Sequence, residues 1–557
     1  MPTLVCVPIA VRDIEVALRD AFAAQELGAE IVEFRVDGFE SATLLDDIAA
    51  LVSRSCLPCI LTCRSSREGG AHAGDDEERL AVIRRCCADA KPGEHPPRYL
   101  DFELASLADI GGESALAQVC PDSGATGTII SMHDFEGRPA DFSRRVRGMR
   151  ESRAEVLKVA IRARSIRDNL ELFELLAERD RPTIALGIGE FGLMSRVLAP
   201  KFGGFLTFAS LRRQSATAPG QPTVDELLNL YRFRTVNKRT RVYGVVGYPL
   251  GHSMSPLVHN AGFAALGHDA VYLPLPIPGE PQVEGSYENL KGTLLELIEH
   301  PQLDFTGCSV TLPHKEHLFR LATEQGWSID PTARTVGAAN TLRVTRDAGG
   351  RKLRVEITNT DGSAAMAALA DTVGGVDRLR GRSVGVVGAG GAARSIAHGA
   401  LACGCKVTVF NRSAESAERL SDELNGQRRE PASARPLNSL ATSRCDVYVN
   451  CTPLGMKGGP EPETIAIPVR EIDALLPPGE ERPVVLDTVY NPMLTPLLAA
   501  AKELRWRAID GVQMFVRQAE TQFQYWVGSA PPDRLFDSLV RARLAESEAS
   551  SPDQNPA

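Results

Sequence analysis

Residues 156–163 read VLKVAIRA, and this stretch decides how the first half of the chain is interpreted. An unbroken short run of valine, leucine, isoleucine and alanine predicts a strand that is buried on both faces, as in a parallel sheet. Lys158 lies inside that run. Because an ammonium is costly to remove from water unless it is paired or gives up its proton, this lysine needs a structural or chemical reason.

Seven further apolar runs of this kind alternate with helical patterns between residues 4 and 210. Eight strand and helix pairs at this spacing are typical of a (β/α)8 TIM barrel, whose active sites lie at the C-terminal ends of the strands. The sequence therefore predicts an α/β protein that begins with such a barrel. The other seven runs are LVCVPIA (4–10), EIVEFRVD (30–37), CILTCR (59–64), RYLDFELA (98–105), GTIISMHD (127–134), TIALGIG (183–189) and FLTFAS (205–210).

Polar side chains gather in the later parts of these predicted strands, so we expect them to converge on one pocket. They are Glu33, Arg35, Arg64, Glu103, His133 and Lys158. A lysine that is desolvated and close to other cations loses basicity, and its neutral amine can attack a carbonyl to form a Schiff base. His133 on the neighbouring strand could then move protons. The alternative is a lysine that reaches the barrel rim or pairs with Glu33 or Glu103.

Six segments resemble, in order and spacing, the motifs of type I 3-dehydroquinate dehydratase across residues 1–236: EFRVD, LTCRSSREGG, SMHDF, LKVAIRA, GLMSRVLAP and TAPGQ. The resemblance implies that Lys158 forms the imine, that His133 relays protons during loss of water, and that Glu68 orients the histidine. It also implies that Glu33, Arg35, Arg64, Arg196 and Gln221 hold the substrate's carboxylate and hydroxyls. Thr217 stands where members of the family often carry serine, and its hydroxyl is retained.

The stretch SVGVVGAGGAARSIAHGALACGCKVTVFNRS (383–413) contains a strand, a glycine-rich turn, a helix and a second strand. This unit predicts dinucleotide binding, because Gly388 allows the tight turn, Gly390 lets backbone approach a pyrophosphate, and Ala393 permits close helix packing. The turn also includes Ala389, Gly391 and Ala392. The second strand ends in Asn411, Arg412 and Ser413 in place of an acidic residue, so Arg412 favours the extra phosphate of NADP(H). The alternative is an ordinary surface arginine.

Four segments before this unit, YGVVGYPLGHSMSPLVHNAGF (243–263), SVTLPHKE (309–316), VGAANTL (336–342) and ITNTDGSA (357–364), resemble shikimate dehydrogenase, and the resemblance extends over about residues 241–530. It implies a substrate domain followed by an NADP-binding Rossmann domain. One departure is Ser309, where many bacterial relatives carry asparagine.

The same resemblance assigns roles to single residues. Lys315 and Asp361 match the catalytic pair, and a lysine ammonium suits ketone reduction because it stabilises and protonates the oxygen that becomes negative. Ser253, Ser255, Asn340, Tyr490 and Gln518 match substrate contacts, Thr311 and Ser255 favour shikimate over quinate, and Thr452 and Gly511 are expected at the cofactor.

Composition is consistent with a small-molecule enzyme. The chain has 557 residues and a net charge of −9, and it has a pI near 5.7 and no long basic run, so we expect neither a nucleic-acid nor a membrane partner. It shows no apolar stretch of about 20 residues and no signal peptide, which predicts a cytoplasmic protein. Twelve cysteines occur, and only Cys56 and Cys59 form a CxxC, so no metal is expected.

The sequence thus predicts a barrel over residues 1–236, a short basic join, a substrate domain over 241–362 completed by helices at about 511–545, a Rossmann domain over 363–510, and a disordered tail over 546–557. The two resemblances imply dehydration of 3-dehydroquinate to 3-dehydroshikimate, followed by NADPH-dependent reduction to shikimate. Two alternatives stay open: a second half that acts mainly on quinate, and a non-catalytic regulator built on the same folds. The oligomeric state is left open.

Overall fold

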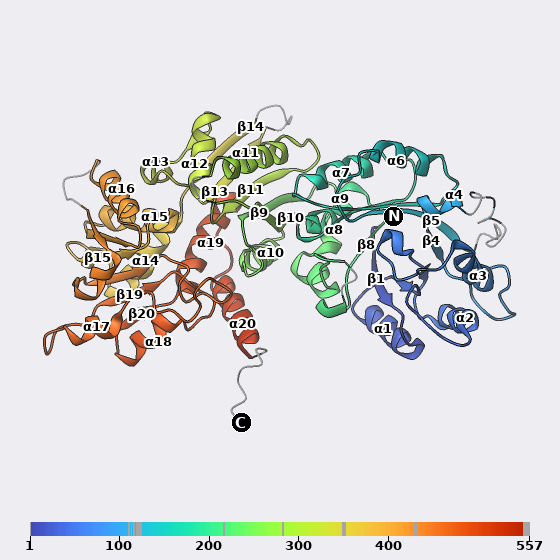
Figure 1. Ribbon diagram of the computed structural model, residues 1–557. Coiled ribbons are helices and arrows are strands. Elements are labelled where there is room, and N and C mark those ends of the chain that lie inside the picture. Colours follow the sequence, from blue (N-terminus) through green and yellow to red (C-terminus); the bar gives the residue numbers. More distant parts are fainter. Residues whose placement is uncertain are drawn as a thin grey trace, which may run out of the picture. The chain divides into compact units, whose positions relative to one another are not determined.

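The computed structural model describes residues 2–109, 112, 114, 117, 125–215, 218–280, 283–347, 353–426 and 432–549 (Figure 1). The chain divides into two compact units, which we describe separately. The first comprises Met1–Arg241 with Asp269–Pro276 and Glu299–Asp304, and the second comprises the rest.

Eight parallel strands form the predicted barrel in the first unit. Each pairs with its neighbour in the order β7-β6-β5-β4-β3-β2-β1-β8, and the backbone N–H of Phe205 donates to Thr183 O at 2.9 Å across the remaining seam. All eight apolar runs therefore became strands. Their bounds are β1 (Leu4–Ala10), β2 (Ile31–Arg35), β3 (Cys59–Thr62), β4 (Tyr99–Glu103), β5 (Gly127–Asp134), β6 (Val156–Arg162), β7 (Thr183–Ile188) and β8 (Leu206–Phe208).

Helices follow most of these strands and cover the outside of the barrel. Asp13 and Asp75 cap the helices α1 and α3 by accepting hydrogen bonds from first-turn backbone N–H groups, which satisfies donors that a helix start leaves unpaired. The helices are α1 (Ile14–Glu26), α2 (Leu44–Arg54), α3 (Asp76–Cys86), α4 (Leu104–Asp109), α6 (Phe142–Glu151), α7 (Asp168–Ala177), α8 (Leu193–Val197) and α9 (Ala199–Phe202).

The barrel interior is layered. One layer is apolar and buried, with Ile31, Ile60, Tyr99, Ile129 and Val156 on five successive strands. Side chains two residues apart on a strand point to the same face, so the next interior layer toward the C-terminal ends consists of the residues two positions later. That layer is polar and buried: Glu33, Thr62, Asp101, Ser131 and Lys158.

A mixed sheet with the strand order β10-β9-β11-β13-β14-β12 follows the barrel. Strands β9 and β11 are parallel, whereas β13 runs antiparallel to both β11 and β14. Its strands are β9 (Arg241–Gly247), β10 (Ala270–Pro276), β11 (Phe305–Val310), β12 (Ser328–Ile329), β13 (Thr341–Arg346) and β14 (Leu353–Thr358), and its helices are α10 (Ser255–Ala265), α11 (Glu284–Glu299), α12 (Lys315–Glu324) and α13 (Pro331–Val336).

The second unit also holds a parallel sheet in the order β17-β16-β15-β18-β19-β20. This is the doubly wound order 3-2-1-4-5-6, which places a dinucleotide at the carboxyl ends of the strands. Its elements are β15 (Ser383–Val387), α15 (Gly391–Ala402), β16 (Lys406–Asn411), α16 (Ala414–Asn425), β17 (Ser433–Pro436), β18 (Val447–Asn450), α17 (Val469–Ala474), β19 (Val484–Asp487), α18 (Pro496–Glu503) and β20 (Arg507–Ile509).

Three long helices complete the second unit, which contains the parallel sheet and the mixed sheet apart from β10. They are α14 (Asp361–Val373), α19 (Gly511–Val527) and α20 (Leu535–Ala549), and Figure 1 shows α14 and α19 beside the parallel sheet. Helix α20 includes residues 546–549 of the predicted tail, and the rest of that tail lies outside the described residues. In the described part of the chain, every helix is too short or too polar to cross a lipid bilayer.

Candidate active sites

Lys158 lies in the polar layer of the barrel and is only 5% exposed. Its Nζ lies 3.0 Å from Glu33 Oε1 and 2.7 Å from Asp101 Oδ2, and it sits 4.6 Å from the ring centroid of Phe208. The pairing with Glu33 that the sequence offered as an alternative is therefore present. A lysine that is buried with two carboxylates and one aromatic face is held in a single place.

Asp101 is the second partner of Lys158, and the sequence interpretation missed it. Its Oδ1 accepts from Arg64 Nη2 at 2.7 Å and from Ser131 Oγ at 2.6 Å. Burial opposes ionisation of this carboxyl, but the charges of Arg64 and Lys158 outweigh it and lower the pKa of Asp101. The signal was available, because Asp101 and Glu103 are two residues apart on one strand and so share a face.

Glu103 contacts Arg64 rather than Lys158. Its Oε1 lies 3.0 Å from Arg64 Nη1, and its Oε2 pairs with Arg79, a fully buried arginine on α3. Arg35 forms a two-pronged ion pair with Asp37 at 2.8 and 3.0 Å. Glu103 therefore bonds to Arg64, another residue of the predicted set, whereas Arg35 bonds to Asp37. The two carboxylates that hold Lys158 are Glu33 and Asp101.

His133 pairs with Glu68, as the resemblance implied. Its Nδ1 lies 3.0 Å from Glu68 Oε2, and its backbone N–H donates to the same oxygen at 2.9 Å. Burial raises the pKa of Glu68 to about 7, while burial and then the charges of Arg64 and Lys158 lower the pKa of His133. The contact is therefore a hydrogen bond of a neutral imidazole more than an ion pair. When Glu68 is ionised, Nδ1 carries the proton and Nε2 keeps a lone pair.

Arg196 on α8 is a buried cation that forms no ion pair among the described residues. Its Nη1 donates only to Phe208 O at 3.4 Å, and its Nε has no partner. Burial lowers the pKa of Arg196 to about 10. A buried arginine in this state fits an anionic ligand, because a carboxylate would supply the missing acceptors. Gln221 is half-buried in the segment that follows β8. Thr217 lies outside the described residues.

Lys315, Asp361 and Asn340 form the second polar cluster. Lys315 Nζ pairs with Asp361 Oδ2, and Asn340 Nδ2 donates to Asp361 Oδ1 at 2.8 Å and to Thr360 Oγ1 at 3.0 Å. Lys315 begins α12 and Asp361 begins α14. One carboxylate thus orients the lysine and the amide together.

The remaining predicted substrate contacts lie on elements around this cluster. Ser255 begins α10 and its N–H donates to Ser253 Oγ at 3.3 Å. The backbone N–H of Met254, which lies between these two serines, donates to the Tyr490 hydroxyl. Thr311 follows β11, where its N–H donates to Val246 O at 2.8 Å.

Gln518 lies on α19, one turn before Gln522 and on the same face. The sequence interpretation missed Gln522, whose Oε1 accepts from Ser309 Oγ at 2.8 Å and whose Nε2 donates to Asn340 O at 3.1 Å. The serine that departs from the bacterial pattern is therefore used to hold α19 against the Asn340 segment.

The glycine-rich turn between β15 and α15 fits a dinucleotide phosphate. Gly388 has φ +116°, and a Cβ there would lie 3.1 Å from Cys451 O, whereas a Cβ at Gly390 would meet only open space. A Cβ at Gly391 would lie 3.1 Å from Lys315 Cβ. The turn, Ala392 and Lys315 line one cavity of about 400 Å³. The glycine-rich turn therefore adjoins Lys315.

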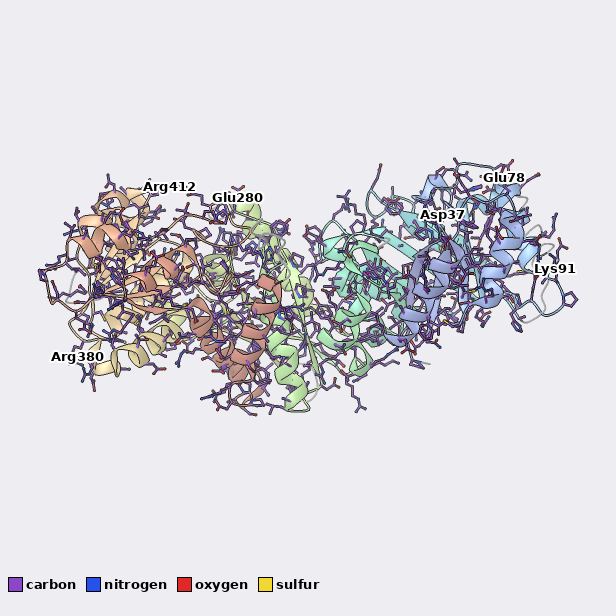
Figure 2. The ribbon with its side chains drawn as sticks, turned by 90° about the horizontal axis from the view of Figure 1, so that it is seen from below. Asp37, Glu78, Lys91, Glu280, Arg380 and Arg412 are labelled. Atoms are coloured by element: carbon purple, nitrogen blue, oxygen red, sulfur yellow. The ribbon has the colours of Figure 1, made fainter. Side chains whose placement is uncertain are left out.

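The residues expected to contact the cofactor further along have structural partners as well. Thr452 Oγ1 donates to Asn450 Oδ1 at 2.6 Å, and Ser413 caps α16 by accepting from Ser416 N. Asn411 Nδ2 donates to Ser413 O at 3.2 Å. Gly511 begins α19, where a Cβ would overlap Val489 O. Arg412 is exposed directly after β16, and Figure 2 shows it on the surface.

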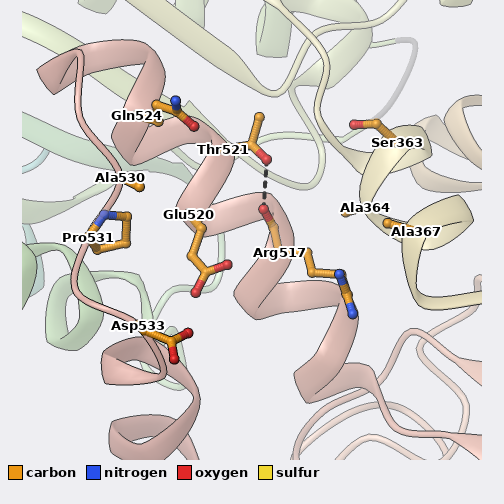
Figure 3. Close-up of a pocket in the computed structure, with 10 residues that line it drawn as sticks. All are labelled: Ser363, Ala364, Ala367, Arg517, Glu520, Thr521, Gln524, Ala530, Pro531 and Asp533. Atoms are coloured by element: carbon orange, nitrogen blue, oxygen red, sulfur yellow. Dashed lines mark hydrogen bonds between the residues drawn. The ribbon is translucent and has the colours of Figure 1, made fainter. Parts of the chain in front are cut away.

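A second cavity of about 540 Å³ lies between α14, α19 and the segment that leads to α20. Figure 3 shows Arg517, Glu520, Thr521 and Gln524 along one side of α19 facing it. Gln518 and Gln522 lie on another face of that helix, and none of the residues predicted for either site lines this cavity. In the described part of the chain no three histidine, cysteine or acidic side chains are grouped to hold a metal.

Comparison with known proteins gives matches along both halves. The family models that match are type I 3-dehydroquinase over residues 5–238, the shikimate dehydrogenase substrate binding domain over 245–342, and shikimate / quinate 5-dehydrogenase over 369–454.

Two curated relatives and one solved structure illustrate the similarity. The chloroplastic bifunctional 3-dehydroquinate dehydratase/shikimate dehydrogenase of Arabidopsis thaliana is 33% identical over 552 residues, which cover 97% of this chain and 84% of that protein. Shikimate dehydrogenase (NADP(+)) of Symbiobacterium thermophilum is 36% identical and covers 55% of this chain and 95% of its own. The solved shikimate 5-dehydrogenase of Thermus thermophilus is 28% identical, covers 54% of this chain and 99% of its own, and has a TM-score of 0.42.

The match to the Arabidopsis protein covers 97% of this chain, and family models match both halves. The chain belongs to the family of bifunctional 3-dehydroquinate dehydratase/shikimate dehydrogenases.

Proposed function

We propose that the two polar clusters catalyse consecutive reactions: dehydration of 3-dehydroquinate to 3-dehydroshikimate at Lys158, and NADPH-dependent reduction of that product to shikimate at Lys315. The observation that carries the proposal is that each half of the chain holds one lysine paired with an aspartate. Both lysines lie in segments that resemble the catalytic motifs of the two families.

In the barrel, the amine of Lys158 would attack the substrate ketone, so that a C–N bond forms and water leaves. Its proton must first pass to a neighbour, and Glu33 and Asp101 both lie within 3.0 Å. His133 Nε2 would then take a proton from the carbon beside the imine and return it to the departing hydroxyl. Water finally hydrolyses the imine. Arg196 and Arg64 are suited to hold the substrate carboxylate and a hydroxyl.

In the second half, the bound nicotinamide would supply a hydride to the ketone carbon. Lys315 would stabilise the oxygen as it becomes negative and give it a proton. Asp361 and Asn340 orient that lysine and offer acceptors and donors to the neighbouring hydroxyls. Ser253, Ser255, Thr311, Tyr490 and Gln518 would complete the substrate pocket. The cofactor is NADP(H), in keeping with the NADP(+) dependence in the name of the Symbiobacterium relative.

Identification of the product by mass tests the whole proposal. Purified chain given 3-dehydroquinate and NADPH should yield shikimate. Quinate, which is one water heavier, would mean that the second half reduces 3-dehydroquinate directly. A chain that consumes neither compound would support the alternative of a non-catalytic regulator built on the same folds.

We also propose that the protein is cytoplasmic and that its domains run over residues 1–236, 241–362 with 511–545, and 363–510. Cell fractionation tests the first statement, and limited proteolysis, with cleavage expected near residues 237–240, tests the second.

A further inference from the structure

Asn359 lies two residues before Asp361 and is 3% exposed. All three of its polar bonds reach fixed groups: Oδ1 accepts from Asp361 N at 3.0 Å, and Nδ2 donates to Ala338 O and to Ser395 Oγ, both at 2.9 Å. A buried amide with every bond satisfied holds its neighbours in one arrangement. The segment ITNTDGSA contains this residue, but neither the predicted site roles nor the proposed mechanism uses it.

Ser395 links this asparagine to the cofactor turn. It lies on α15, where its Oγ donates to Gly391 O at 2.8 Å, and Gly391 is the first residue of that helix. Hydrogen bonds therefore run without interruption from the start of α15 through Ser395 and Asn359 to the backbone of Asp361.

The crossing of α14 and α15 makes this link stiff. A Cβ at Gly362 would overlap Ser395 O, and a Cβ at Gly399 would lie 3.1 Å from Gly362 O. The two helices thus touch backbone to backbone beside Asp361. The Lys315 side chain also packs directly against Gly391, so there is little space for the lysine and aspartate to move relative to the cofactor turn.

We propose that Asn359 is a positioning residue for the reduction, which fixes Asp361, and through it Lys315, relative to the first turn of the cofactor helix. This inference rests on the proposed roles of Lys315 and Asp361. Its physical reason is that hydride and proton must reach the same carbonyl in one geometry, and a displacement of about 1 Å costs on the order of 100-fold in rate.

Substitution of Asn359 by alanine in the full chain tests the proposal. The kcat for reduction of 3-dehydroshikimate should fall about 10- to 100-fold, while the KM for NADPH stays within about 3-fold and the primary isotope effect with deuterated NADPH rises because hydride transfer becomes slower. Hydrogen exchange without cofactor gives a separate readout. The amide of Asp361 loses its acceptor, so the peptide that contains it should exchange faster.

Ser395→Ala removes only the hydrogen bonds that link Asn359 to α15. It should also lower kcat, but by a smaller factor than Asn359→Ala. The double variant should be no slower than Asn359→Ala alone, because both changes break one chain of bonds. Ser421→Ala is the matched control: Ser421 is a buried serine on α16 that donates to Ala432 O at 3.0 Å, away from Asp361. Its kcat and exchange near Asp361 should match those of the parent chain.

An Asn359→Ala chain that is folded, exchanges faster near Asp361 and keeps its full kcat would overturn the inference, as would a loss confined to the KM for NADPH. If that variant does not fold, an unchanged kcat in folded Ser395→Ala overturns it instead. Failure of the underlying function looks different, because then Lys315→Ala would keep its reductase activity or the parent chain would show none.

Discussion

Lys158 forms ion pairs with two carboxylates, those of Glu33 and Asp101, and we expect its amine to be essential for dehydration. Lys158→Ala should reduce dehydration of 3-dehydroquinate by at least about 1000-fold, because among the described residues of the polar barrel layer only Lys158 carries an amine that can form the imine. Reduction of added 3-dehydroshikimate should continue at the parent rate. The two reactions are followed separately, by the absorbance of the enone product and by NADPH consumption.

Lys91→Ala supplies the matched control, since Lys91 is an exposed lysine of the barrel that pairs with Asp46 at 3.0 Å (Figure 2). It should leave both rates unchanged. Borohydride should trap substrate on the parent chain and on Lys91→Ala but not on Lys158→Ala. Substrate trapped on the Lys158 variant would place the Schiff base on another residue.

Glu68 gives the second prediction, which concerns pH. Burial raises its pKa to about 7, so the carboxylate form that accepts from His133 Nδ1 is present above that pH and is lost below it. Protonated Glu68 carries no charge, so it no longer stabilises the imidazolium that forms when His133 takes a proton. The kcat/KM for dehydration should therefore rise with pH through about 7, as measured in buffers from acid to alkaline pH.

Glu68→Gln should abolish this acid limb, because an amide does not titrate, and should lower kcat/KM by about 100-fold, because a neutral amide does not stabilise the imidazolium that forms when His133 takes a proton. Glu78→Gln, on the exposed face of α3 (Figure 2), is its control and should keep the parent profile. A parent profile that stays flat well below pH 7 would contradict the assignment of Glu68.

The residues that the sequence predicted and those it missed differ in a physical way. Lys158 and His133 stand out because a charged or titratable side chain within or at the end of an apolar run is unusual, whereas Lys315 was assigned only through the resemblance to shikimate dehydrogenase. Asn359 and Arg79 were missed because their importance lies in which partners they bond, and such partners are not visible from spacing. The spacing of Asp101 to Glu103 places it on the same face of the strand, but its bond to Lys158 is not visible from the sequence either. Asp101 and Lys158 are 57 positions apart and their side chains lie 2.7 Å apart.

At the scale of elements, hydrophobic patterns predicted the strands well. Each apolar run of the barrel became a strand, because a doubly buried parallel strand needs apolar residues on both faces. The division of the interior into an apolar and a polar layer follows from the same two-residue period. The pattern does not determine how a loop such as the one that follows β8 folds, since loop conformation depends on contacts and not on periodicity.

The junction of β16 and α16 provides the third prediction. Arg412 follows the last residue of β16 and is exposed, where an arginine can pair with the extra phosphate of NADPH. Arg412→Ala should raise the KM for NADPH by about 10-fold and leave the KM for NADH nearly unchanged, because only NADPH carries that phosphate. Initial rates with each cofactor measure the difference.

Arg380→Ala is the comparison for this variant, because Arg380 is another exposed arginine of the same part of the chain (Figure 2). It should alter neither KM. Equal losses with NADPH and NADH in Arg412→Ala would show that this arginine contributes general electrostatic attraction and does not select the phosphate.

The whole molecule contains two polar clusters, one around Lys158 and one around Lys315. Among the described residues, the ion-pair partners of Lys158 differ from those of Lys315. A chain whose first site is inactive should therefore complement one whose second site is inactive. Fusion of the two activities raises the local concentration of the intermediate only where geometry permits direct transfer. The simplest expectation is that 3-dehydroshikimate leaves one site and reaches the other by diffusion.

A mixture of Lys158→Ala and Lys315→Ala chains should thus convert 3-dehydroquinate and NADPH to shikimate, whereas neither variant does so alone. NADPH consumption should begin after a lag that shortens as the protein concentration rises, because free intermediate must accumulate before the second reaction reaches its rate. The parent chain should show the same lag at equal site concentrations. A lag in the mixture but none in the parent would demonstrate direct transfer, and no conversion by the mixture would mean that one substitution disables both sites.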